Sequence, residues 1–169
     1  MATEAAVRTF FSSPNFAVVG ASSNPAKFGH KIFNWYTQRS LPVTPINPGA
    51  TSITAPRPGG TVGPRSSNQD LETYPTLPNL SALPSPRDTA VSVITPPAVT
   101  KTVLAEAKAL GIPAVWLQPG TFDDDLLRDA LADFKGGVGG PGGAGGEGYC
   151  VLVDGDRGLK MAGRTEGRL

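Results

Sequence analysis

Short apolar runs alternate with amphipathic stretches along most of the chain. Four of these runs are rich in β-branched or other apolar residues and lie at residues 16–20, 43–47, 89–95 and 114–117. Each run ends at glycine, proline or polar residues. Runs of this kind are typical of strands buried in a parallel sheet. A further apolar run, at residues 148–154, is predicted to form the last strand.

Between these runs, apolar residues recur at helical spacing. We predict helices over 29–38, 98–111 and 121–134, the last of which begins near Asp123. In the second helix, one face carries the apolar residues Val99, Val103, Ala107 and Leu110. Pro45 has no N–H to donate, so the second strand is expected at an edge of the sheet or at an irregularity. This alternation predicts an α/β, Rossmann-like fold, a mostly parallel sheet with helices on both faces.

Glycine and proline, with 21 and 17 residues, gather in two segments, 53–69 and 136–148. Neither segment has a periodic apolar pattern, so we predict mobile surface loops within a single domain that spans residues 1–169. If they have a function, the loops would serve as a lid or as a surface for a protein partner.

Charge and cysteine content narrow the function classes. The 15 basic and 14 acidic residues nearly balance, which disfavours nucleic acid and acidic membranes as partners. No apolar run reaches the roughly 20 residues of a membrane span. The single cysteine, Cys150, fits a reducing compartment, and we expect a cytoplasmic protein.

The candidate ligand site is the turn in residues 18–32, VVGASSNPAKFGHKI. In parallel sheets, ligands bind beyond the carboxyl ends of the strands, where the strand order reverses. Ser22, Ser23 and Asn24 offer hydroxyl and amide groups, Lys27 offers a charge, and the helix that follows offers free N–H groups. Together these groups predict a phosphate site, although an ordinary capped turn would look similar.

Two features count against a nicotinamide cofactor. No glycine follows Gly20 until Gly29, which breaks the G-x-G-x-x-G pattern, and the second strand ends in Asn47 where an acidic residue would bind the ribose. Nucleophilic catalysis is also disfavoured, because His30 is the one histidine and is expected to pack or to make a minor ligand contact. The acidic run that begins at Asp123 is read as a helix start and not as a metal site.

The motifs VVGASSNPAKFGHKIF, PINP, VSVITPPAV, GIPAVWLQPG and YCVLVD, in this order, resemble the small stand-alone CoA-binding domain proteins. Those proteins are similar to the N-terminal CoA-binding domain of the succinyl-CoA synthetase α subunit. The resemblance runs from about residue 16 to residue 154. It implies a Rossmann-like domain that holds CoA or an acyl-CoA across the strand ends and performs no chemistry alone.

The resemblance also implies which residues meet the ligand. They are Gly20, Ala21, Ser22, Ser23, Asn24 and Lys27 at the diphosphate, Asn47 and Pro48 at the adenosine, Thr95, Pro96 and Pro97 at the pantetheine or adenine, and Gln118, Pro119 and Gly120 at the thiol-bearing arm. Related proteins often carry a basic residue soon after the second strand. This chain has Gly49 and Ala50 there, so Arg57 or Arg65 is the candidate for the 3′-phosphate.

Two other functions stay open. One is an NAD(P)-dependent oxidoreductase that uses the same crevice, and the other is a nucleotide-responsive regulatory module that binds a protein partner. Cys150 also has two readings, as a buried structural residue or as a thiol that forms a mixed disulfide with CoA.

Overall fold

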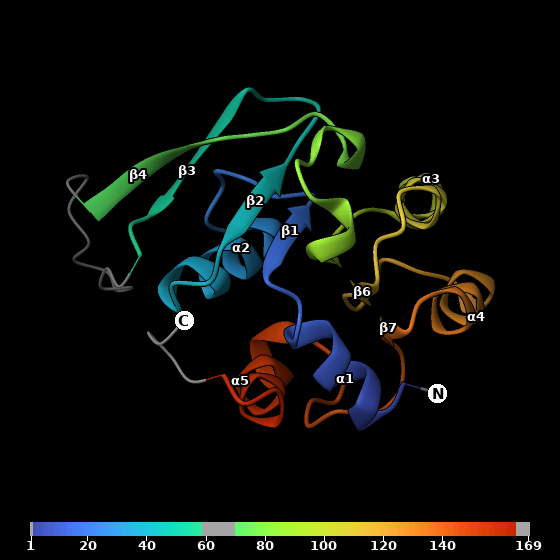
Figure 1. Ribbon diagram of the computed structural model, residues 1–169. Helices are drawn as coiled ribbons and strands as arrows, with labels where there is room; N and C mark the ends of the chain where they lie inside the picture. Colours follow the sequence, from blue (N-terminus) through green and yellow to red (C-terminus); the bar gives the residue numbers. More distant parts are fainter. Residues whose placement is uncertain (1, 59–69, 165–169) are drawn as a thin grey trace.

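Five parallel strands form the centre of the computed structural model, which describes residues 2–58 and 70–164 (Figure 1). The strands are β1 (Asn15–Val19), β2 (Val43–Ile46), β5 (Thr89–Val93), β6 (Ala114–Leu117) and β7 (Gly136–Val138). Their order is β2-β1-β5-β6-β7, and every neighbouring pair is parallel. The predicted α/β, Rossmann-like architecture is confirmed.

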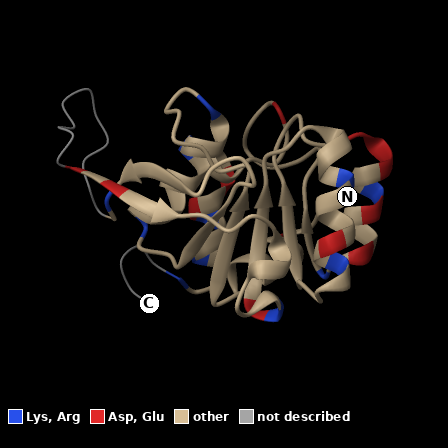
Figure 2. Cartoon of the chain, turned by 90° about the horizontal axis from the view of Figure 1, so that it is seen from above, with Lys and Arg blue, Asp and Glu red and all other residues tan. Residues whose placement is uncertain are grey.

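Successive side chains of each strand face opposite sides of the sheet and divide the core in two. Phe16 and Val18 pack in one cluster under α1, α2 and α5, whereas Ala17 and Val19 pack in the other, under α3 and α4. The helices are α1 (Glu4–Phe11), α2 (Phe28–Gln38), α3 (Pro97–Ala109), α4 (Asp124–Asp133) and α5 (Val151–Met161). Figure 2 shows the five strands free of charged residues, as burial on both faces requires.

β2 lies at an edge of the sheet, as its proline predicts. On its outer side, the N–H of Leu77 donates to the carbonyl of Pro45 at 3.0 Å, and the N–H of Asn47 donates to the carbonyl of Leu77 at 3.0 Å. The segment around Leu77 therefore covers the carboxyl half of this edge strand.

The segment 53–69 begins in a strand, against expectation. Its first residues belong to β3 (Ser52–Pro56), which pairs antiparallel with β4 (Leu71–Pro75) in a separate two-stranded sheet. Ile53 and Ala55 alternate into the core, a pattern too short to stand out among the neighbouring prolines. The expectation of mobility concerns residues 59–69, which lie outside the described residues.

The segment 136–148 also begins in a strand, β7. Its glycines allow close packing, since a Cβ at Gly136 would lie 2.5 Å from the Cβ of Ala114. The predicted last strand at 148–154 is wrong, because residues from Val151 onward form α5. Gly155 and Gly158 face the rings of Trp35 and Phe11, so close helix packing outweighs the low helix propensity of glycine.

The sequence did not lead us to expect α1. Thr3 caps it by accepting a hydrogen bond from the N–H of Ala6 at 3.1 Å. Phe10 and Phe11 are fully buried and pack edge-on against Trp116. In the described part of the chain, no helix is long and apolar enough to cross a membrane.

One buried polar pair crosses the core. The hydroxyl groups of Tyr36 on α2 and Ser92 on β5 lie 2.6 Å apart, both fully buried. Burial raises the pKa of Tyr36 well above its ordinary range, so the phenol stays neutral and hydrogen-bonded.

We predict that Tyr36→Phe lowers the free energy of unfolding by about 1–3 kcal/mol, because it leaves the Ser92 hydroxyl buried and unpaired. The double variant Tyr36→Phe/Ser92→Ala should recover part of this loss. Urea denaturation of the parent, both single variants and the double variant measures the coupling. Strictly additive losses would contradict the pairing.

Candidate functional site

The direction of the strand connections reverses between β1 and β5. From β1 the chain crosses through α2 to β2 at one edge, and from β5 it crosses through α3 toward β6 on the other side. The connections that leave the carboxyl ends of β1 and β5 therefore run in opposite directions, and this is where open α/β sheets bind ligands.

Two glycines allow the backbone segments to meet here. Gly20 has φ +97°, and a Cβ on it would lie under 3.0 Å from the carbonyl oxygen of Ile94. A Cβ on Gly29 would approach the carbonyl oxygen of Gly20 equally closely. The glycine spacing that departs from the dinucleotide pattern is thus explained by the packing of α2 against the ends of β1 and β5.

Between these glycines, the turn makes its own hydrogen bonds. Ser22 Oγ accepts from the N–H of Asn24 at 3.1 Å, and Asn24 Oδ1 accepts from the N–H of Ala26 at 3.0 Å. Ser23 Oγ accepts from the N–H of Thr54 in β3 at 3.0 Å. The serine hydroxyls accept in these bonds, so their hydrogens stay available to donate to a ligand. Lys27 is exposed at the N-cap of α2 and makes no capping bond with its side chain.

Asn47, at the end of β2, ties this turn to the sheet. Its Nδ2 donates to the carbonyl of Ala21 at 3.0 Å, and its Oδ1 accepts from the N–H of Gly49 at 2.8 Å. The amide is therefore engaged by the backbone on both sides. The family resemblance implies a contact of Asn47 with the adenosine, and the geometry gives it a second role as a positioning residue.

A cavity of about 260 Å³ opens beside the turn, at the carboxyl ends of β1, β2 and β5. The residues that line it are Val19, Gly20, Ile46, Asn47, Pro48, Pro78, Asn79, Leu80, Thr95, Val99, Thr102, Val103 and Glu106. Four of the predicted residues, Gly20, Asn47, Pro48 and Thr95, come together here from three strands.

One wall of the cavity was not predicted. Val99, Thr102, Val103 and Glu106 come from successive turns of α3. Of the predicted apolar face, Ala107 is buried and Val103 and Leu110 pack against the core, whereas Val99 is 47% exposed and lines the cavity. The apolar face of α3 can be recognised in the sequence, but its position beyond the carboxyl end of β5 cannot.

Gln118, Pro119 and Gly120 do not line this cavity. Gln118 is 2% exposed, and its Oε1 accepts from the N–H of Val151 at the start of α5 at 3.0 Å. The assignment of these three residues to the thiol-bearing arm stays a prediction. Pro96 and Pro97 stand at the start of α3, next to the cavity residues Thr95 and Val99.

His30 lies beneath the turn and not at its surface. It is 7% exposed, and its Nδ1 lies 2.9 Å from the carbonyl oxygen of Ser22. This contact agrees with the expected packing role.

Arg57 follows β3 near the carboxyl end of α2, and its assignment to a 3′-phosphate stays a prediction. Its carbonyl accepts from Gln38 Nε2 at 3.0 Å, so it lies at the carboxyl end of α2, whereas the turn lies at the amino end. The 11-residue helix separates the two ends by roughly 16 Å. Arg65, the other candidate, lies outside the described residues.

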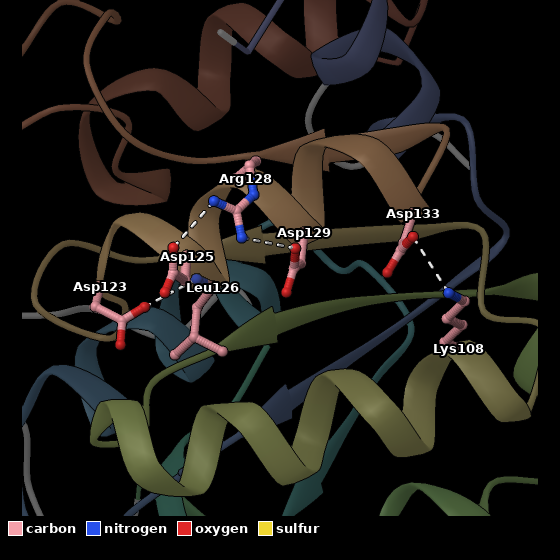
Figure 3. Close-up of polar contacts among 7 residues, drawn as sticks. All are labelled: Lys108, Asp123, Asp125, Leu126, Arg128, Asp129 and Asp133. Atoms are coloured by element: carbon pink, nitrogen blue, oxygen red, sulfur yellow. Dashed lines mark hydrogen bonds and ion pairs between the residues drawn. The ribbon is translucent and has the colours of Figure 1, made fainter.

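The acidic run that begins at Asp123 starts a helix, as expected. Asp123 Oδ1 accepts from the N–H of Leu126 at 2.8 Å, and Arg128 pairs with Asp125 and Asp129 (Figure 3). Lys108 on α3 reaches Asp133 on α4 at 3.2 Å. These acidic side chains cap a helix and pair with cations, and no group of described residues could hold a metal ion.

Cys150 is the N-cap of α5, not part of a strand, and it is half-buried. Burial raises the pKa of its thiol, which lowers the thiolate fraction at neutral pH. The geometry thus disfavours a ready mixed disulfide with a ligand thiol.

The fold is a Rossmann-like domain, and the cavity is a candidate ligand site at the switch point of its sheet. Residues 14–140 match the model of a protein family described as the CoA binding domain. The chain belongs to this family. No curated protein matches the chain.

Solved structures of similar fold include proteins from Pyrococcus and Thermus species. A conserved hypothetical protein of Pyrococcus furiosus is 27% identical with a TM-score of 0.55, and the match covers 70% of this chain and 86% of that one. A hypothetical protein of Pyrococcus horikoshii is 19% identical, with a TM-score of 0.59 and coverage of 78% and 80%. A Thermus thermophilus protein is 22% identical, with a TM-score of 0.57 and coverage of 78% and 86%. The last two likenesses show the fold alone.

We predict that Gly29→Ala destabilises the fold by several kcal/mol, because the new Cβ would meet the backbone carbonyl of Gly20 and neither segment can move freely. Gly146→Ala is the control, since a Cβ there has nothing within 4 Å. Guanidinium denaturation compares both variants with the parent. Equal stability of the three proteins would contradict the close approach.

We also predict that the alkylation rate of Cys150 by iodoacetamide rises with pH along a curve displaced to higher pH than that of the same protein unfolded in urea. The direction follows from the raised pKa, since the thiolate is the reactive form. Mass spectrometry of timed samples gives both curves. Coinciding curves, or a folded curve at lower pH, would refute this.

Proposed function

We propose that the protein binds CoA or an acyl-CoA in the crevice at the carboxyl ends of β1, β2 and β5, without catalysis of its own. One observation carries the proposal. In a chain that belongs to the CoA binding domain family, the ends of three strands and one face of α3 enclose a cavity beside a turn suited to phosphate.

The turn supports the position of the diphosphate. It lies at the amino end of α2, where the helix dipole and the first N–H groups favour an anion. The hydroxyls of Ser22 and Ser23 can donate, and Lys27 adds a flexible positive charge. Because Asn47 and Thr54 already hold the turn, little ordering is needed when a ligand binds.

The residues that line the cavity favour ligand binding over catalysis as its function. Its described lining holds no histidine, cysteine or lysine, and most of its side chains are apolar. At the position where a dinucleotide enzyme would present a carboxylate to the ribose, Asn47 is engaged with Ala21 and Gly49. These features favour CoA over a nicotinamide cofactor. A cytoplasmic location fits the one cysteine of the chain and is part of the proposal.

Two exposed valines provide a matched pair of variants. Val99 is the third residue of α3 and 47% exposed, and Val153 is the third residue of α5 and 51% exposed. Glutamate suits the first turn of a helix, so either substitution should leave the fold intact. Only Val99 lines the cavity.

We predict that Val99→Glu weakens CoA binding at least tenfold, because it narrows the cavity and sets a negative charge near an anionic ligand. Val153→Glu should bind like the parent. Isothermal titration with CoA, acetyl-CoA and NAD measures the affinities, and thermal unfolding without ligand checks the fold. Unchanged affinity in folded Val99→Glu would place the ligand elsewhere, and equal binding of NAD and CoA would refute the choice of ligand.

A further inference from the structure

The charge of the cavity limits which part of CoA can enter it. Among the described residues that line it, none is cationic and one, Glu106, is anionic. The side chains of Val19, Ile46, Leu80, Val99 and Val103 make most of the remaining wall apolar. A phosphate would meet a carboxylate without a compensating cation, which is unfavourable in such surroundings. The cavity therefore suits an uncharged part of the ligand.

The size of the cavity points to one group and not to the whole ligand. A volume of about 260 Å³ lies below the roughly 300–1,000 Å³ of sites that enclose a complete small molecule. α3 supplies one apolar wall through Val99 and Val103, and the loops that carry Pro48 and Pro78 supply another. A flat aromatic ring with apolar faces matches these walls.

Glu106 provides the polar contact. Its Oε1 accepts a hydrogen bond from the N–H of Leu80 at 2.6 Å, which fixes the carboxylate at the cavity wall. Its Oε2 makes no hydrogen bond or ion pair with any residue that the structure describes. An ionised carboxylate only accepts hydrogen bonds, so a ligand group at Oε2 has to be a donor.

We infer that this cavity takes the adenine ring of the ligand and that Glu106 Oε2 accepts a hydrogen bond from its 6-amino group. The inference rests on the proposed function and adds a specificity-determining residue to it. Glu106 selects adenine against rings that carry an oxygen at this position, because two acceptors would then face each other. The acidic side chain that the end of β2 lacks is supplied from α3, and it is directed at the base and not at the ribose.

The substitution Glu106→Gln tests this with little change in shape. The N–H of Leu80 continues to require an acceptor, so the glutamine turns its Oε1 toward Leu80 and its Nε2 toward the cavity. The cavity then presents a donor where it presented an acceptor. Glu147→Gln is the control, because it removes the same charge from an exposed loop residue that does not line the cavity.

The probes are CoA and its hypoxanthine analogue, in which an oxygen replaces the 6-amino group. We expect the parent and Glu147→Gln to bind CoA at least tenfold more tightly than the analogue. Glu106→Gln should reduce this ratio at least tenfold or invert it. Isothermal titration of the three proteins with both compounds gives the six affinities, and the parent alone provides a test that needs no variant.

The outcomes separate this inference from the function on which it rests. Two results would contradict the inference: equal binding of CoA and its analogue by the parent, or an unchanged ratio of the two affinities in folded Glu106→Gln. Glu106 would then make no contact that distinguishes the base, and the pantetheine arm would be the better occupant of the cavity. CoA binding itself then stands. If the parent binds neither compound, both the proposed function and this inference fail.

Discussion

The contact between the carbonyl of Gly20 and the first turn of α2 governs the site. Because Gly29 has no side chain, α2 packs directly against the end of β1, and because Gly20 has none, β1 packs against the carbonyl of Ile94. These two approaches place the amino end of α2 over the sheet at the point where its connections diverge. The positions of the turn and of the cavity beside it depend on this contact.

The central elements could be predicted because their signals are local. Residues 16–20 and 89–95 are apolar and β-branched, and the stripe of Ile32, Phe33 and Tyr36 has a clear helical period. Parallel pairing then follows from the alternation of strands and helices. For the same reason the ends of β1, β2 and β5 could be expected to meet, and Gly20, Asn47 and Thr95 do line one cavity.

The other features depend on packing between residues that lie far apart in the sequence, so no short stretch of the sequence predicts them. Gly155 and Gly158 disfavour a helix locally, yet the rings of Trp35 and Phe11 accept no larger residue on α5. Glu106 looks like an ordinary surface residue of an amphipathic helix until the position of Leu80 gives its carboxylate a partner. Arg57 is only a few residues from the site in sequence but lies at the far end of α2, because β3 runs along that helix.

The two layers of the core also separate the tasks of the site. The turn at the amino end of α2 belongs to the layer built by α1, α2 and α5, whereas the cavity wall belongs to the layer of α3 and α4. Each strand sends alternate side chains to the two layers, so the side chains that pack beneath the turn differ from those that form the wall on α3. The residues that bind phosphate and the residues that determine ligand specificity can therefore change independently during evolution. A designer could alter the ligand preference of this fold by changing the exposed face of α3 alone.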